Sequence, residues 1–380
     1  MIFDYETLKL IWWLLIGALL IGFVITDGFD IGVGALLPFL GKKDEERRVI
    51  INAIGPHWEG NQVWFVTAGG AIFAAWPAVY AAAFSGFYIA MLLVLFALFF
   101  RPVGFDYRSK IEDPRWRSAW DWGIFTGSTV PALIFGVAFG NLFLGVPFQH
   151  DEFLRPTYTG TFWALLNPFA LLSGVVSLSM LVMHGAVWLQ LRTEALIARR
   201  AAVAVQVSAA VLIASFALAG VFIAYGIDGY IISSMPEAGA HSNPLAKEVI
   251  IGDRSWMTNY SSFPWMILAP VLAFTGAALT LLLARANRPG LAFLTSSMAM
   301  TSVILTAGFS LFPFIMPSST LHNSSLTLWD AASSHLTLSV MFWAVAILLP
   351  LVLAYTVWTY RAMWGRVTVE HIRDNPHSTY

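Results

Sequence analysis

The strongest constraint on the fold is a series of nine long apolar segments. A helix needs about 20 apolar residues to cross the hydrocarbon core of a bilayer, whereas a β-barrel shows short segments of alternating hydrophobicity. The apolar segments here cover about 8–38, 50–75, 79–100, 120–146, 161–190, 201–226, 262–284, 290–315 and 335–360. We therefore expect an all-α integral membrane protein, a single polytopic domain over residues 1–380. Nine transmembrane helices would pack naturally as two four-helix bundles plus one peripheral helix.

Composition excludes several classes of protein. Hydrophobic residues make up 58% of the 380 residues and charged residues only 11%, against about 25% charged in a soluble domain. A net charge of −1 provides no basic surface for a nucleic acid. The absence of cysteine excludes disulfides and thiolate metal sites. A soluble enzyme and a nucleic-acid-binding protein are thus both excluded.

The basic residues predict the orientation in the membrane. With nine spans, 17 of the 21 Lys and Arg residues fall on one side, and this excess marks the cytoplasm. We expect a periplasmic N-terminus and a cytoplasmic C-terminus, with the first span retained rather than cleaved as a signal peptide. The second span is the least apolar, but an eight-span arrangement would export the basic loop GKKDEERR at 41–48.

Three acids lie inside predicted spans, where a charge is costly and suggests a function. Asp27 and Asp30 are three residues apart on one face of the first span. Glu59 lies in the second span, two residues after His57. Both helices start from the same cytoplasmic loop, so Asp30 and Glu59 should lie at the same depth, about 15 Å from that surface. We expect these carboxylates to meet.

Glycines accompany the acids of the first span. Gly28 and Gly32 form a GxxxG pattern around Asp30, and small residues at this spacing let a neighbouring helix approach closely. Two interpretations of the acids remain open: a path for protons or cations from the cytoplasm, or a buried polar cluster that links helices without changing protonation.

Other polar and aromatic residues also allow two interpretations. Arg101 and Asp106 close the third span on the cytoplasmic side, as interfacial ion pairs or as the entrance to a proton path. Trp58 and Trp64 flank Glu59 and either line a gas or cofactor pocket or simply pack. His184 is expected to be a hydrogen-bonded core residue rather than a haem ligand. No spacing of residues predicts a metal site.

Long motifs are similar to those of a known family. They are TDGFDIGVG at 26–34, PHWEGNQVW at 56–64, FFRPVGFDYRSK at 99–110, WDWGIF at 120–125, FPFIMPSS at 312–319 and SLTLWDAASS at 325–334. Through these strings, which are spread over the whole length, the chain resembles subunit II of the bacterial cytochrome bd-type quinol oxidases.

The resemblance implies a respiratory terminal oxidase that oxidises quinol, reduces O₂ to water and takes protons from the cytoplasm. It adds to the proton-motive force without pumping and lies in the bacterial inner membrane. Haem b and haem d would be held mainly by the partner, subunit I, which pairs with subunit II as a pseudo-symmetric heterodimer. A small single-helix subunit and a structural ubiquinone are further expected partners of the complex.

The resemblance also bears on the acids. Asp30 and Glu59 fall on family positions that carry an acid, although many relatives have Asp where this chain has Glu59. The hypothesis is a relay from Asp106 and Arg101 at the entrance to Asp30, His57 and Glu59, with Asp27 beside them. Two alternatives remain: a secondary transporter that uses these carboxylates as cation ligands, or a purely structural scaffold subunit.

Overall fold

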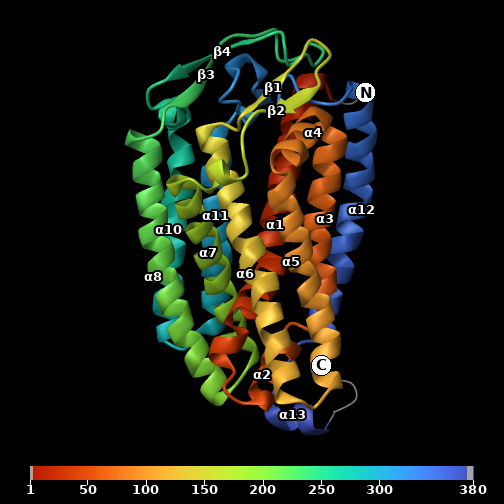
Figure 1. The fold of residues 1–380 in the computed structure, drawn as a ribbon, viewed down its shortest axis with the longest axis vertical. Helices are drawn as coiled ribbons and strands as arrows, with labels where there is room; N and C mark the ends of the chain where they lie inside the picture. The colour runs from red at the N-terminus through yellow and green to blue at the C-terminus, as the bar shows by residue number, and fades with distance from the viewer. Residues whose placement is uncertain (1–2, 375–379) are drawn as a thin grey trace.

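The computed structural model describes residues 3–374 and 380, and long parallel helices dominate it (Figure 1). Eight helices in this described part are long and apolar enough to cross a membrane. They are α1 (Tyr5–Leu40), α5 (Tyr88–Tyr107), α6 (Pro114–Leu144), α7 (Pro168–Arg192), α8 (Ala195–Tyr225), α10 (Leu268–Arg285), α11 (Pro289–Leu311) and α12 (His335–Ala362).

A bent pair of helices is the candidate for a ninth span. The helices α3 (Trp58–Ala75) and α4 (Pro77–Gly86) pass the same test together, with a bend of 120° between them. Pro77 stands at the first position of α4 and disfavours a helical backbone at Trp76. The prediction of an all-α membrane fold is confirmed, and the predicted nine spans are reached when this bent pair is counted as one span. Most of the predicted segment 79–100 corresponds to α5.

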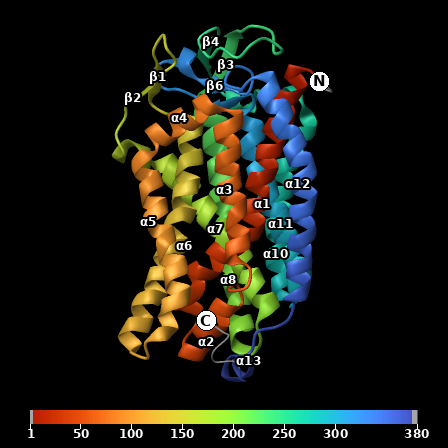
Figure 2. The ribbon, with the colours of Figure 1, turned by 90° about the vertical axis from the view of Figure 1, so that its right-hand side faces the viewer.

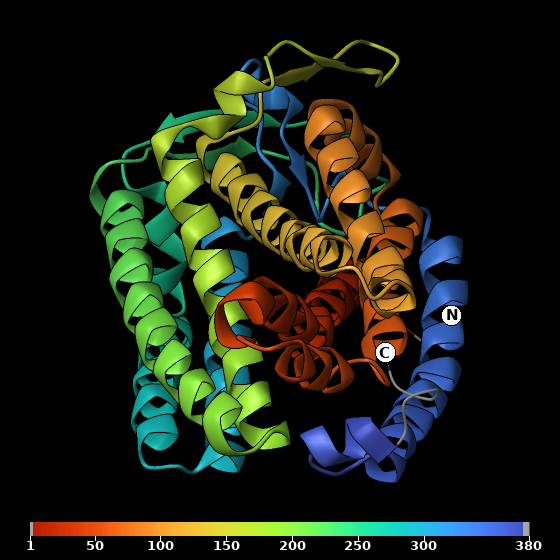
Figure 3. The same cartoon turned by 60° about the horizontal axis from the view of Figure 1, so that its bottom comes forward.

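The spanning helices can be described as two groups of four. One group holds α1, α3, α5 and α6, and the other holds α7, α8, α10 and α11. The groups are joined by α1, which packs on α7 and α11 as well as on its own group, and by α6, which packs on α7. Figure 3 shows α1 in red, between the orange and the green–cyan helices. The predicted peripheral helix is α12, which lies at the edge against α1 and α3 (Figure 2).

Capping residues in the sequence set where several helices begin. The carboxylate of Asp4 accepts a hydrogen bond from the Thr7 amide at the start of α1. Asn167 does the same for α7, where Pro168 occupies the first position. Side chains of this kind satisfy amides that have no partner within the helix, and proline loses nothing there because it has no N–H.

The two ends of the molecule differ. The end that carries the start of α1 also carries three small antiparallel sheets, and we call it the sheet end (Figure 1). The opposite end, called the basic end, carries the short helices α2 (Asp44–Asn52) and α13 (Val369–Asp374). The remaining short elements are β1 (Phe148–His150), β2 (Pro156–Tyr158), β3 (Gly229–Ser234), β4 (Glu248–Gly252), α9 (Thr258–Ser262), β5 (Phe314–Met316) and β6 (Leu326–Thr327).

Buried charges hold the sheet end together. Lys247 forms an ion pair with Asp330 at 2.8 Å, and both side chains are nearly inaccessible to solvent. Burial raises the pKa of Asp330 and lowers the pKa of Lys247, since both charged forms lose water. The Lys9 ammonium donates to three main-chain carbonyls, those of residues 238, 240 and 329. This cluster ties the loops of the sheet end to the first turns of α1.

Candidate functional site

Close packing of α1 on α7 shapes the site. A Cβ atom at Gly32 would lie 2.1 Å from the carbonyl oxygen of Leu181, and one at Gly185 would lie 2.5 Å from the backbone of Gly32. Only glycine allows this approach of the two backbones. At Gly28, the next turn of α1, a Cβ would meet the Leu181 side chain at 2.9 Å. The prediction that these glycines admit a neighbouring helix is confirmed.

Asp27 and Arg101 form a buried ion pair between α1 and α5. The guanidinium donates to both carboxylate oxygens, at 2.7 and 3.2 Å, and each side chain is at most 2% exposed. Arg101 thus points into the bundle, and it is not an interfacial residue, because α5 continues for six residues beyond it. Pairing in this geometry offsets part of the cost of burying two charges.

Asp30 belongs to a second polar group, formed with α3 and α12. Its Oδ2 accepts a hydrogen bond from Asn61 Nδ2 at 2.8 Å, and Asn61 Oδ1 accepts one from the Tyr360 hydroxyl at 2.7 Å. Within the described chain, Asp30 Oδ1 is buried without a hydrogen-bond partner. The sequence analysis missed Asn61 and Tyr360 as members of this group.

His57 lies beside this group, in the break before α3. Its ring stacks on the Tyr360 ring at 4.4 Å and meets the Trp188 ring edge-on at 6.1 Å. The imidazole is buried, and neither ring nitrogen has a hydrogen-bond partner in the part of the chain that the structure describes. The break itself follows from Pro56, which disfavours a helical conformation at Gly55.

Glu59 does not meet Asp30, contrary to expectation. Residues two apart on a helix are separated by about 200°, so the turn that aims Asn61 at α1 aims Glu59 the other way. Glu59 and Asp106 are both exposed on the surface of the chain. The structure therefore divides the predicted residues into an interior set, with Asp27, Asp30, His57 and Arg101, and a surface pair.

The two tryptophans beside Glu59 pack against neighbouring helices. Trp58 is buried against Phe105 of α5, with ring centroids 5.4 Å apart. Trp64 of α3 packs against α1, where a Cβ atom at Gly22 would lie 2.6 Å from the indole. Neither tryptophan lines either of the two apolar cavities described below.

Two apolar cavities lie between the helices. One of 250 Å³ lies among α1, α6 and α7, with Phe23, Phe135 and Met180 in its wall. The other, a groove of 910 Å³, runs along α1, α3 and α4 and includes Trp76 and Tyr80. The Trp76 indole N–H is buried without an acceptor among the described residues.

The described residues offer little for binding a metal ion. They contain no group of three or more His, Cys, Asp and Glu placed to hold one, and no histidine lines either cavity. His184 contacts the Ser296 hydroxyl through Nδ1 at 2.7 Å and the Ile25 carbonyl through Nε2 at 3.0 Å. The prediction of a hydrogen-bonded core histidine is confirmed, and this residue joins α7, α11 and α1.

Comparison with known proteins identifies the family. A family model described as cytochrome bd terminal oxidase subunit II matches residues 8–363. Cytochrome bd-I ubiquinol oxidase subunit 2 of Escherichia coli (strain K12) is 58% identical over 377 residues, which cover 99% of this chain and 100% of the relative. Cytochrome bd ubiquinol oxidase subunit 2 of Bacillus subtilis (strain 168) is 34% identical over 363 residues, 94% of this chain and 96% of the relative.

A solved structure shares the fold. The bd oxidase from Geobacillus thermodenitrificans contains a chain that superposes with a TM-score of 0.63 at 16% identity, covering 94% of this chain and 99% of that chain. The likeness thus extends over nearly the whole of both chains. Matched along nearly its whole length, this chain belongs to the family of cytochrome bd terminal oxidase subunit II.

Proposed function

We propose that this chain is subunit II of a quinol:O₂ oxidoreductase of the bacterial inner membrane. The full-length identity to ubiquinol oxidase subunits carries this conclusion. The chain works with a haem-bearing subunit I, and it holds no complete active site by itself. Its basic end faces the cytoplasm, and its sheet end faces the periplasm, because most Lys and Arg residues lie at the basic end.

The cofactors divide between the two subunits. Haem b and haem d, which supply electron transfer and the oxygen-reducing centre, belong mainly to subunit I, since no histidine lines either of the two cavities described above. The 910 Å³ groove suits a structural ubiquinone: its wall is apolar, and the unpartnered Trp76 indole is a donor for a quinone carbonyl. A small single-helix subunit completes the assembly that we expect.

We further propose that the interior acids assist proton delivery to the partner's haem. Reducing O₂ to water consumes protons at a buried centre, and a bare charge cannot cross the hydrocarbon core. Asp30 is the favoured interior acceptor, because one of its oxygens is fixed by Asn61 and the other has no hydrogen-bond partner among the described residues. Asp27 and Arg101 contribute a fixed charge pair, whereas Glu59 and Asp106 would act from the surface of the chain.

Purification of the complex tests the oxidase assignment. The tagged chain should copurify with a second large subunit and with haem absorbance, and the complex should consume O₂ when supplied with ubiquinol. A preparation without haem that instead accumulates a cation in vesicles would favour the secondary transporter.

Acid-to-amide variants test the proton path. Asp30→Asn and Glu59→Gln keep the size of each side chain and remove its titration, so O₂ consumption should fall while the haem spectrum stays complete. Asp253→Asn, at an exposed aspartate of the sheet end, is the matched control. Full O₂ consumption in both variants would refute the relay, and the chain would then be a purely structural scaffold subunit. Lost haem d in an otherwise assembled complex would point to a structural role for the acids.

A further inference from the structure

A tyrosine ring fills a notch in the break between α2 and α3. A Cβ atom at Gly55 would lie 2.6 Å from Cδ2 and 2.7 Å from Cε2 of Tyr380. Only the absence of a side chain at Gly55 makes room for this ring, because contacts below 3.0 Å do not occur between real Cβ atoms and their neighbours. The docking of Tyr380 therefore depends on this one glycine.

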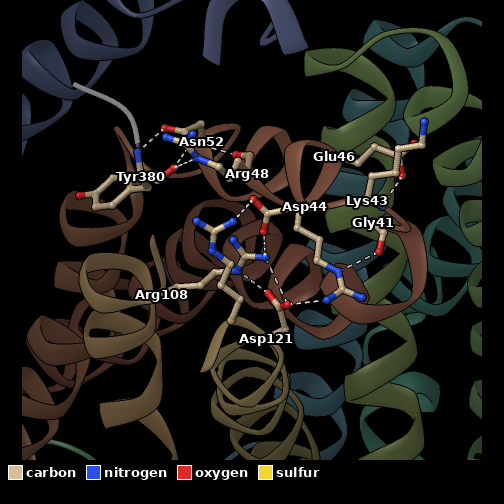
Figure 4. Close-up of polar contacts among 11 residues, drawn as sticks. Gly41, Lys43, Asp44, Glu46, Arg48, Asn52, Arg108, Asp121 and Tyr380 are labelled. Atoms are coloured by element: carbon tan, nitrogen blue, oxygen red, sulfur yellow. Dashed lines mark hydrogen bonds and ion pairs between the residues drawn. The ribbon is translucent and has the colours of Figure 1, made fainter. Parts of the chain in front are cut away.

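The main chain of Tyr380 is held as firmly as its ring (Figure 4). Its N–H donates to Asn52 Oδ1 at 3.0 Å, and its carbonyl accepts from Asn52 Nδ2 at 3.1 Å and from Arg48 Nε at 3.0 Å. The carboxamide of Asn52 thus binds both polar groups of one residue, as a neighbouring β-strand would. Such two-point bonding fixes orientation as well as position.

Ion pairs hold the opposite side of α2. Arg108 donates to Asp121 at 2.6 Å and to Asp44 at 2.9 Å, and Arg47 contacts the same Asp121 at 2.6 Å (Figure 4). These contacts anchor the first half of α2 to α6 and to the turn after α5. Tyr380 contacts the second half and the break, a part that these ion pairs do not reach.

The break bears directly on the proposed proton path. It ends at His57, and α3 then begins with Trp58 and Glu59. The Tyr380 ring lies 6.3 Å from Phe105, and Phe105 lies 5.4 Å from Trp58, so a row of three rings connects Tyr380 to the first residue of α3. The residue after Phe105 is Asp106, the other acid on the surface.

We propose that Tyr380 is a positioning residue, which fixes the break between α2 and α3 and thereby the first turn of α3 by filling the notch over Gly55. This inference rests on the proposed function, since its effect on turnover acts through the acids of that turn. Tyr380 does not transfer a proton. Its ring sets the place of Trp58 and Glu59 relative to Asp106.

A pair of substitutions tests the docking in the complete oxidase. Tyr380→Ala empties the notch and Gly55→Ala displaces the ring, so each should lower O₂ consumption, on the order of tenfold, against the ~100-fold that a 1 Å misplacement can cost. The double variant carries both Gly55→Ala and Tyr380→Ala. The methyl group at position 55 then fits the notch that the ring has left, where its next neighbour is the Ile51 carbonyl at 3.5 Å. The double variant should therefore be no slower than Tyr380→Ala alone.

The pH profile separates positioning from general damage. Poorly placed proton donors limit turnover most when protons are scarce, so the activity of Tyr380→Ala should fall more steeply than wild type above pH 7, with the haem spectrum unchanged. Tyr380→Phe keeps the ring and should match wild type. Tyr225→Ala removes an exposed ring near the other end of the molecule and serves as control.

Several results would overturn the inference. One is that the double variant loses O₂ consumption by the product of the two single losses. Another is that Tyr380→Ala is fully active, or that Tyr380→Phe loses as much O₂ consumption as Tyr380→Ala. A third is that the activity of Tyr380→Ala falls by the same factor at every pH. If Tyr380→Ala does not assemble, Gly55→Ala carries the pH test alone, because it leaves the hydrogen-bonding groups of Asn52 and Tyr380 in place. If the substitutions at Gly55 and Tyr380 are coupled in thermal stability but do not change turnover, the positioning role is refuted and the proposed relay is not. If Asp30→Asn and Glu59→Gln are both active, the proposed relay is refuted.

Discussion

Replacing Gly32 by alanine should separate the two helices that enclose the site. The new methyl carbon would lie 2.1 Å from the Leu181 carbonyl oxygen and 2.9 Å from the Gly185 Cα. This falls about 1.3 Å short of the 3.4 Å at which ordinary contact begins. Both neighbours are backbone atoms of α7, so no side-chain rotation can relieve the clash, and the helices must move apart.

The cost of this separation can be worked from the contacts that it breaks. Overpacking typically costs about 1–3 kcal/mol, and two further contacts cross the same interface. Phe29 of α1 stacks on Trp188 of α7 at 4.1 Å, and His184 contacts the Ile25 carbonyl at 3.0 Å. Weakening one such hydrogen bond adds about 1 kcal/mol. We therefore expect a total loss of about 2–4 kcal/mol.

Thermal denaturation of the purified complex at a fixed scan rate measures this effect. Gly32→Ala should lower the Tm by several degrees. Gly220→Ala is the matched control, because a Cβ at that position of α8 meets nothing within 4 Å. It should be neutral or slightly stabilising, since alanine favours a helix by about 1 kcal/mol over glycine. Equal Tm values for the two variants would refute the close packing of α1 on α7.

Three further predictions concern charges and the core histidine. Arg101→Met leaves the Asp27 carboxylate buried alone and should lower the free energy of unfolding by about 3–5 kcal/mol. The double variant with Asp27→Leu should recover most of this loss. Equal Tm values for the single and double variants would contradict the ion pair. Burial raises the pKa of Glu46, but the hydrogen bonds from Arg200 and two amides outweigh it, so the pKa lies below its usual 4.5. The stabilisation from the ionised Glu46 is thus complete above pH 4.5 and is lost as the pH falls further. The Tm of Glu46→Gln should therefore fall less steeply than that of wild type below pH 4.5. An unchanged slope of Tm against pH would contradict this. His184→Phe should lower the Tm through about 1–3 kcal/mol of unsatisfied polar groups, with an unchanged haem content per complex; loss of haem from a folded complex would make His184 a ligand.

Much of the fold could be predicted from local pattern. Apolar length fixed the number of spans, and the basic loop at 41–48 decided in favour of the weak second span. The GxxxG pattern predicted the close contact of α1 because glycine spacing is local information. The start of the third span was harder to predict: the predicted segment 79–100 begins inside α4, whereas α5 begins at Tyr88, because Pro77 bends the chain within a continuous apolar run.

The site was only partly accessible from sequence. Depth along a hairpin could be counted, but the direction of a side chain around α3 could not, so Glu59 was expected where Asn61 lies. Tyr360 is 299 residues from Asn61 along the chain, and no local pattern links two such positions. Arg101 looked interfacial because the apolar run ends there, although α5 itself continues to Tyr107.

The lysine near the start of α1 places a requirement on biosynthesis. Lys9 is completely buried, and its carbonyl partners lie 229, 231 and 320 positions further along the chain. While the ribosome is still making the middle helices, this ammonium has none of these partners. The first helix therefore enters the bilayer before the Lys9 ammonium has these hydrogen-bond acceptors. The complete set of contacts forms only after more than four-fifths of the polypeptide has been synthesised. Chains that stall before residue 329 should for this reason be recognised as unfinished by quality-control proteases.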